Sequence, residues 1–242
     1  MNLKITIIIP ILLTVLIYGG KSKLEKHTIA SIPEASGISY CQNTDTLIVA
    51  NDEGSFYEIS PNGKILSRHK LGDYDLEGVV CEEKQILFAV EKGALITIPR
   101  LEPKINYQKL KGKQFKLNKK AGIEGIAKVG ELYYLTIQSK ENKEDAKILV
   151  VKCGNNYAKV VETIHHGIID SAGMEYKDNK LYIVSDKKDK LYIYDLKQKK
   201  IIKKVKLPKF AQEGITFGKN GDVFFADDDG AVMRYTLKEL GL

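Results

Sequence analysis

One six-residue pattern with a central glycine occurs five times along this 242-residue chain. Its glycines are separated by 41, 47, 48 and 41 residues. A period of this length is typical of a four-stranded propeller blade, and shorter helical repeats do not match it. We call each copy a glycine motif, and the copies are EASGIS (34–39), DLEGVV (75–80), GIEGIA (122–127), DSAGME (170–175) and AQEGIT (211–216).

Each glycine motif is followed by the same succession of strand and turn patterns. A β-branched and aromatic run comes first, then a polar turn, then a second strand-like run. The runs are LIVAND, ILFAVE, LYYLTI, LYIVSD and VFFADD, followed by SFYEI, ALITI, KILVV, KLYIYDL and AVMRY. Four copies continue into a further strand, KILSRHKL, INYQKL, KVVETIHH or KIIKKVKL, whereas the fifth reaches the end of the sequence first.

The segment 23–30, KLEKHTIA, alternates polar and apolar residues and could supply the strand that the fifth copy lacks. Pairing the two chain ends would remove the unpaired edges of an open ring. A plain linker is the alternative for this segment. The sequence therefore predicts an all-β fold, a five-bladed β-propeller with four-stranded antiparallel blades whose ring is closed by an N-terminal strand. We expect residues 21–242 to form this single domain.

The first residues have the pattern of a secretory signal. Lys4 precedes an uncharged run over 5–18, which at 14 residues is shorter than the roughly 20 that a spanning helix needs. Cleavage after Gly19 is acceptable, but an uncleaved anchor stays open. We expect 1–20 to be a signal peptide or short membrane anchor. The protein is then extracytoplasmic, either periplasmic or attached to the outer side of the cytoplasmic membrane.

Lysine-rich runs at 109–120 and 199–209 give the chain a net charge of +7. Such runs could contact an anionic membrane surface. Lysine alternating with apolar residues, as in IIKKVKL, also describes an outer strand with one wet face. Nucleic acid is not expected as a partner of an exported chain.

The cysteines, Cys41, Cys81 and Cys153, are odd in number and have no C-x-x-C spacing. This argues against a zinc site and against a disulfide framework. We expect three half-buried thiols. A Cys41–Cys81 bridge is the alternative, because both residues closely follow equivalent glycines of adjacent repeats.

The residue before each motif glycine identifies a candidate site. The first strand of each blade lines the central channel of a propeller, so equivalent residues converge on one axis. Those residues are Ser36, Glu77, Glu124, Ala172 and Glu213, with Asp170 two positions earlier in the fourth copy. Convergent carboxylates repel one another unless a hard cation neutralises them, and calcium prefers such oxygen ligands. The alternative is that each glutamate caps a strand by accepting backbone N–H groups.

A second acidic set ends the runs that follow the motifs, and we interpret it mainly as turn chemistry. Its members are Asp52, Glu91, Asp186, Asp227 and Asp228. Motifs of nucleophilic hydrolases, zinc proteases and P-loop enzymes are absent from the sequence, and no histidine falls in a glycine motif. His165 and His166 are adjacent and would point to opposite faces of a strand.

With these motifs laid out, the chain resembles the SdiA-regulated domain family over roughly residues 30–237. The resemblance implies a five-bladed β-propeller, exported or membrane-attached, with a calcium site and no established reaction. The family's motifs fall on 75–78, 123–125, 170–173 and 213–215, with Ile123 standing where an aromatic residue is common. The metal candidates are thus Glu77, Glu124, Glu213 and Asp170.

Two functions follow from this sequence. The first is a non-enzymatic binding module that holds calcium at the channel mouth and binds an unknown small ligand or cell-envelope protein. No catalytic residue is assigned in it. The alternative is a metal-dependent hydrolase, similar to lactonases or phytases, that uses the same axial cation.

Overall fold

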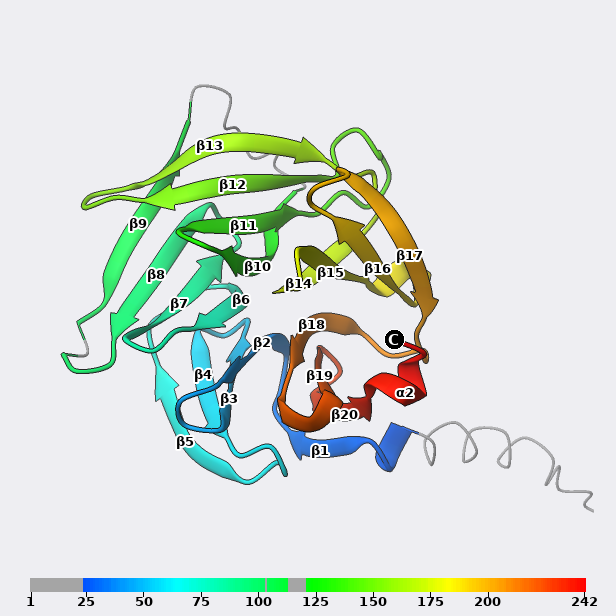
Figure 1. The fold of residues 1–242 in the computed structure, drawn as a ribbon. Coiled ribbons are helices and arrows are strands. Elements are labelled where there is room, and N and C mark those ends of the chain that lie inside the picture. Colours follow the sequence, from blue (N-terminus) through cyan, green and yellow to red (C-terminus); the bar gives the residue numbers. More distant parts are fainter. Residues whose placement is uncertain (1–23, 103, 113–120) are drawn as a thin grey trace, which may run out of the picture.

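The computed structural model describes residues 24–102, 104–112 and 121–242. Most of these residues belong to β-strands, which form antiparallel runs of four around a common axis, as in a β-propeller (Figure 1). Each glycine motif forms one of the strands nearest that axis. These inner strands are β2 (Ala35–Cys41), β6 (Leu76–Cys81), β10 (Ile123–Val129), β14 (Ser171–Lys177) and β18 (Gln212–Phe217).

From each inner strand the chain moves outward through antiparallel neighbours. They are β3 (Thr46–Asn51), β4 (Ser55–Ile59) and β5 (Ile65–Lys70); β7 (Gln85–Val90), β8 (Ala94–Pro99) and β9 (Asn106–Lys111); β11 (Leu132–Ile137), β12 (Lys147–Cys153) and β13 (Ala158–His165); β15 (Lys180–Ser185), β16 (Lys190–Asp195) and β17 (Lys200–Lys206); and β19 (Asp222–Asp227) and β20 (Ala231–Thr236), which precedes the short helix α2 (Leu237–Leu240). The strands predicted after each glycine motif are thus confirmed.

Two of the four-stranded runs join into one eight-stranded sheet. The outer strands β9 and β13 pair in parallel through Leu110 with Ala158 and Lys111 with Lys159. The other pairings inside both runs are antiparallel. The join is therefore a short contact at the periphery.

The last group receives its fourth strand from the other end of the chain. Strand β1 (Thr28–Ser31) pairs antiparallel with β20, with Thr28 opposite Met233 and Ser31 opposite Ala231. The predicted pairing of the two ends is confirmed, although the strand covers 28–31 and the preceding residues form a helical turn. The linker alternative is therefore wrong for these four residues.

The inner strands approach one another most closely at the motif glycines. A Cβ added to one motif glycine would lie close to the backbone of the next inner strand around the axis. The distances are 2.7 Å from Gly37 to Gly78 Cα, 3.1 Å from Gly78 to Gly125 Cα and 2.9 Å from Gly125 to Gly173 Cα. They are 2.5 Å from Gly173 to Gly214 Cα and 2.9 Å from Gly214 to Ile38 N, which closes the ring. These separations are too short for a side chain. Glycine is therefore required here for close approach between strands.

Apolar clusters fill the spaces between neighbouring sheets. Phe88 packs with the β2–β5 sheet, Phe224 lies between the last sheet and the first, and Phe225 lies between β14–β17 and the last sheet. All three side chains are fully buried. Outer strands have the opposite character, since β5 and β17 are mostly exposed. The IIKKVKL segment is accordingly an outer strand with a wet face, as predicted.

Hydroxyl groups add polar links between neighbouring inner strands. Ser39 Oγ accepts from the N–H of Cys81 at 3.0 Å, and Thr216 Oγ1 accepts from the N–H of Tyr40 at 3.1 Å. Thr136 Oγ1 donates to the carbonyl of Ala172 at 2.8 Å. Such bonds satisfy polar groups that burial would otherwise leave unpaired.

Cys41 and Cys81 form a disulfide with a Cα–Cα distance of 5.3 Å. The expectation of three thiols is wrong for this pair, and the alternative bridge is confirmed. The reason is that both cysteines end neighbouring inner strands, which brings them within bridging distance. A native disulfide of this kind typically contributes about 2–5 kcal/mol to stability. Cys153 is a free thiol, and burial raises its pKa to about 11.

The predicted signal or anchor at 1–20 lies outside the described residues, as does most of the lysine run at 109–120. Among the described helices, none is long and apolar enough to cross a membrane.

The close approach of the glycines predicts a large loss of stability for Gly173→Ala. Its Cβ would lie 2.3 Å from the carbonyl oxygen of Glu213, so backbone must move, and overpacking of this kind costs about 1–3 kcal/mol or more. Urea unfolding followed by circular dichroism measures the change. Gly154→Ala is the control, because Gly154 is exposed and its Cβ would meet only Tyr157 O at 3.1 Å. Equal stability losses in both variants would contradict the account.

Candidate functional site

Carboxylates gather where the inner strands begin. Glu77 in β6, Glu124 in β10 and Glu213 in β18 each precede a motif glycine, so the close approach of the glycines places them at one level of the ring. Other carboxylates at the ends of neighbouring strands join them. We call this set the acidic mouth, and it comprises Asp52, Asp75, Glu77, Glu91, Glu124 and Glu213.

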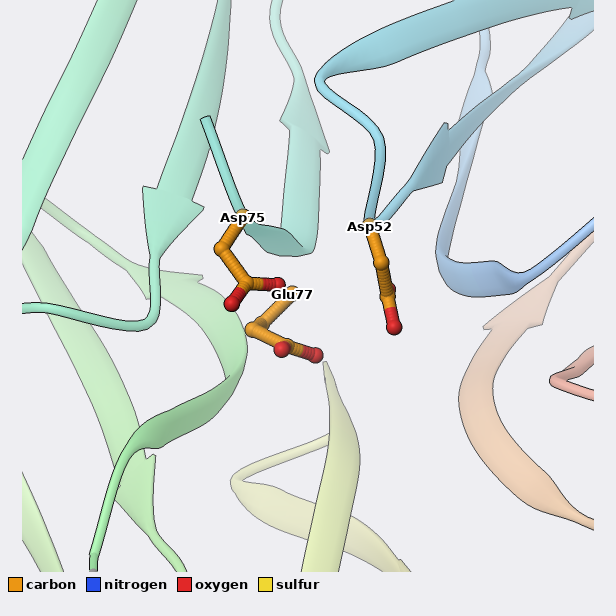
Figure 2. Close-up of side chains that lie close together, drawn as sticks. All are labelled: Asp52, Asp75 and Glu77. Atoms are coloured by element: carbon orange, nitrogen blue, oxygen red, sulfur yellow. The ribbon is translucent and has the colours of Figure 1, made fainter. Parts of the chain in front are cut away.

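Three of these carboxylates form a tight group (Figure 2). Asp52 directly follows β3, Asp75 directly precedes β6, and Glu77 is the second residue of β6. One ligand oxygen from each lies within 4.8 Å of the others. Within the described ranges this is the one group of three acidic, histidine or cysteine side chains that meets this criterion. It joins two neighbouring sheets, because Asp52 comes from the first and Glu77 from the second.

The tight group is electrostatically unfavourable without a cation. Glu77 is 8% exposed, and burial together with the charges of Glu124, Asp52 and Asp75 raises its pKa to about 11. Burial also raises the pKa of Asp52 to about 7, with further increases from Asp228 and Asp75. Both shifts show that the site opposes bare negative charge.

The other two predicted glutamates lie at the same mouth. Burial raises the pKa of Glu124 to about 7, with the Glu91 charge adding to the shift and Lys140 opposing it. Gly122 leaves room for the carboxylates of Glu91 and Glu124, because a Cβ at Gly122 would lie 2.9 Å from an oxygen of each. Burial and the charge of Glu124 raise the pKa of Glu213 well above its ordinary value.

Asp170 is placed differently from the three glutamates. It precedes β14 with a positive φ of 55°, and its side chain is 7% exposed. Its Oδ2 accepts from the N–H of Lys187 at 3.0 Å. One oxygen therefore already has a backbone partner. Asp170 is not counted in the acidic mouth, but its charge contributes to the raised pKa of Glu213.

Two buried oxygens at the acidic mouth accept no hydrogen bond from any described residue, namely Asp52 Oδ1 and Glu213 Oε2. In the same part of the chain, no backbone N–H donates to the carboxylates of Glu77, Glu124 or Glu213, whereas strand-to-strand links use Ser39, Thr136 and Thr216. Strand capping therefore does not explain these glutamates. Unpartnered, closely spaced carboxylate oxygens fit a hard cation.

The second acidic set divides in two. Asp227 accepts from the N–H groups of Ala211 at 3.1 Å and Asp229 at 3.2 Å, which confirms turn chemistry there. Asp52 lies in the turn that follows β3, as predicted, and its carboxylate also joins the tight group. Sequence reasoning also gave Asp75 no site role. Asp52 ends the run that follows the first glycine motif, and Asp75 begins the second motif. Their places in consecutive repeats were the signal that the sequence offered.

Comparison with known proteins agrees with this architecture. A model of the SdiA-regulated family matches residues 18–226. The chain belongs to the SdiA-regulated family. This confirms the resemblance predicted from the glycine motifs. No curated protein matches the chain in sequence.

A solved structure similar to this member of the SdiA-regulated family is glutaminyl cyclase from Myxococcus xanthus. The two share 10% sequence identity at a TM-score of 0.67, and the match covers 86% of this chain and 92% of that chain. At this identity the likeness concerns the fold.

The buried carboxylate of Glu77 predicts that Glu77→Gln stabilises the cation-free protein at pH 8. The folded protein holds the Glu77 proton more tightly than the unfolded chain does. The free energy of unfolding is therefore highest below pH 4.5, the ordinary pKa of the group, and falls as the pH rises from there toward 11. Glutamine carries no such penalty, and the gain should exceed about 1.4 kcal/mol. Urea unfolding in EDTA at pH 5 and pH 8 measures it.

The exposed Glu83 provides the control, since Glu83→Gln should leave both the stability and its pH dependence unchanged. A lower stability of Glu77→Gln at pH 8 would indicate that the carboxylate makes a structural bond, and would contradict this account.

Proposed function

We propose that this protein is an exported five-bladed β-propeller that binds calcium at its acidic mouth and acts as a non-enzymatic binding module. The division into five blades is supported by the five inner strands, each beginning one four-stranded antiparallel run. The eight-stranded sheet consists of two four-stranded blades that meet at the parallel contact of β9 with β13, which involves two residue pairs. The last blade is completed by β1.

The observation that carries the calcium proposal is the tight group of Asp52, Asp75 and Glu77. These residues would hold the ion, with Glu124 and Glu213 adding negative charge nearby. Calcium takes six to eight oxygen ligands, so backbone carbonyls and water would complete its shell. A bound divalent cation would neutralise the carboxylates and link the first two blades across their interface.

Calcium binding predicts a rise in melting temperature that depends on the tight group. At a concentration about 100 times Kd, a ligand specific to the folded state adds about 2.7 kcal/mol. We expect wild type to respond to calcium, and to respond less to magnesium, which demands a stricter octahedral geometry. Asp52→Asn and Glu77→Gln should abolish the response, whereas Glu83→Gln should keep it. Absence of both calorimetric heat and thermal stabilisation in wild type would reject the proposal.

Hydrolysis at the same cation is the second candidate function. A catalytic metal keeps one coordination position open and needs a general base within reach. Glu124 is suited to this role, since its carboxylate lies at the acidic mouth and accepts no backbone N–H from a described residue. Calcium-dependent cleavage of an ester or lactone should then disappear in Glu124→Gln while the circular dichroism spectrum persists. Activity that survives in Glu124→Gln would exclude Glu124 as the base.

An extracytoplasmic location is part of the proposal, either in the periplasm or on the outer side of the cytoplasmic membrane. The Cys41–Cys81 disulfide supports it, because disulfides persist in oxidising compartments. The partner would be a small ligand or a cell-envelope protein.

Contact with an anionic membrane surface is supported by the outer strand β17, whose exposed lysines are Lys200, Lys203, Lys204 and Lys206. It predicts co-sedimentation with phosphatidylglycerol vesicles at low salt and release at high salt, because salt screens exposed charges. Replacing Lys200, Lys204 and Lys206 with glutamate should abolish binding. Binding that does not change with salt would argue against this contact.

A further inference from the structure

The axis also opens at the end opposite the acidic mouth, where the inner strands finish. A cavity of about 1110 Å³ lies there, and residues from the carboxyl-terminal halves of β2, β6, β10, β14 and β18 line it. Cavities that bind small molecules commonly have volumes of about 300–1,000 Å³. The space is therefore large enough for a small organic ligand. We call it the basic cavity.

Its lining carries more positive than negative side chains. The lining cations are Lys84, Arg100, Lys128, Lys177 and Lys219, and the lining carboxylates are Glu82, Glu83 and Glu175. Lys128 is paired with Glu82, and Lys219 lies 3.5 Å from Asp45. The remaining cations have no salt-bridge partner among the described residues. The two ends of the axis thus have opposite charge.

Arg100 is the most constrained of these cations. It is half-buried at the end of β8, where its Nε donates to the carbonyl of Glu82 at 3.2 Å. Its Nη2 lies 3.2 Å from Cys41 Sγ and 2.7 Å from Cys81 Sγ. Among the described residues nothing accepts from Nη1. A guanidinium has five N–H donors, so several donors of a fixed side chain remain available to the cavity.

The carboxylate of Glu82, whose backbone carbonyl accepts from Arg100, is bound to other side chains. Glu82 Oε2 binds Lys128 Nζ, and Glu82 Oε1 accepts from the hydroxyl of Tyr133 and from Gln85 Nε2 at 3.3 Å. Glu82 is thereby occupied by its own partners. Arg234 shows the contrast on the outer surface, because its guanidinium binds both oxygens of Asp222 at 2.9 Å.

Among the lining carboxylates, Glu175 belongs to an inner strand, β14. Its Oε2 accepts from Thr216 Oγ1 and its Oε1 from the N–H of Tyr176, both at 2.8 Å. Burial raises its pKa to about 7, so the site disfavours the charged carboxylate. Its opposition to an anion is correspondingly weak.

We propose that the basic cavity is a second binding site, which takes a small organic anion whose carboxylate or phosphate group binds Arg100. A guanidinium forms strong paired hydrogen bonds with such oxyanions, and a guanidinium already fixed by its neighbours loses little freedom on binding. Lys84 and Lys177 at the same cavity add long-range attraction. This site is independent of calcium, because none of these residues belongs to the acidic mouth.

The test follows the Nε–H signals of the arginines by NMR. The chain has three arginines, Arg68, Arg100 and Arg234, which makes the signals assignable. Inorganic phosphate and citrate are titrated separately at constant ionic strength, in EDTA. We expect a saturable shift at Arg100 and none at Arg68 or Arg234. Response to citrate alone assigns a carboxylate ligand, and response to phosphate alone assigns a phosphorylated one. No saturable shift at Arg100, or equal shifts at all three arginines, overturns the proposal.

Variants provide an independent measurement by isothermal titration with the anion that binds. Arg100→Gln should weaken binding about tenfold or more, since it removes the charge-assisted hydrogen bonds to the anion. Arg68→Gln, on the exposed strand β5, should leave binding unchanged. If Arg100→Gln does not fold, Lys177→Gln, farther from the disulfide in sequence, should still reduce affinity. Wild-type affinity in folded Arg100→Gln or in Lys177→Gln would contradict the assignment.

Discussion

The mutual approach of the five motif glycines is the constraint on which the rest of this structure depends. Each inner strand contacts the next at a position where a Cβ would meet backbone atoms at about 2.3–3.1 Å. The ring closes because Gly214 meets the first inner strand at Ile38. Close approach fixes the relative height of the strands, so residues next to each glycine come to equivalent levels. The carboxylates of the glutamates that precede the glycines are therefore brought close together, even though their charges repel one another.

This geometry explains why the two ends of the axis differ. The inner strands begin near Glu77, Glu124 and Glu213, while Asp75 directly precedes β6 and Asp52 directly follows β3. The strands finish in hydroxyl groups, a disulfide and lysines, with Arg100 reaching in from β8. Burial penalises the carboxylates at the first end, and a guanidinium with spare donors lies at the second. These opposite charges are the basis of our proposal that the first end binds a cation and the second an anion.

Much of the fold could be predicted because it depends on local periodicity. Glycine spacing and alternating runs gave the strands, and the incomplete fifth repeat gave the pairing of β1 with β20. The disulfide was underestimated, because an odd cysteine count says nothing about which strand ends become neighbours. The sequence predicts the turn at Asp52 but not its place in the tight group, for a similar reason. Its side chain can serve a turn or a site, and the choice depends on where β6 places Glu77. Asp170 is the opposite case. The sequence pattern predicts it as a metal ligand, but one of its carboxylate oxygens accepts a hydrogen bond from the backbone N–H of Lys187.

The position of the cation is the most direct test of this account. Crystals of the protein grown with calcium can be measured at a wavelength where calcium scatters anomalously. The account predicts one anomalous peak within coordination distance, about 2.3–2.6 Å, of Asp52, Asp75 and Glu77 oxygens. A crystal without any peak at the acidic mouth, or with a peak bound by Glu124 and Glu213 but not by Asp52 and Asp75, would contradict it.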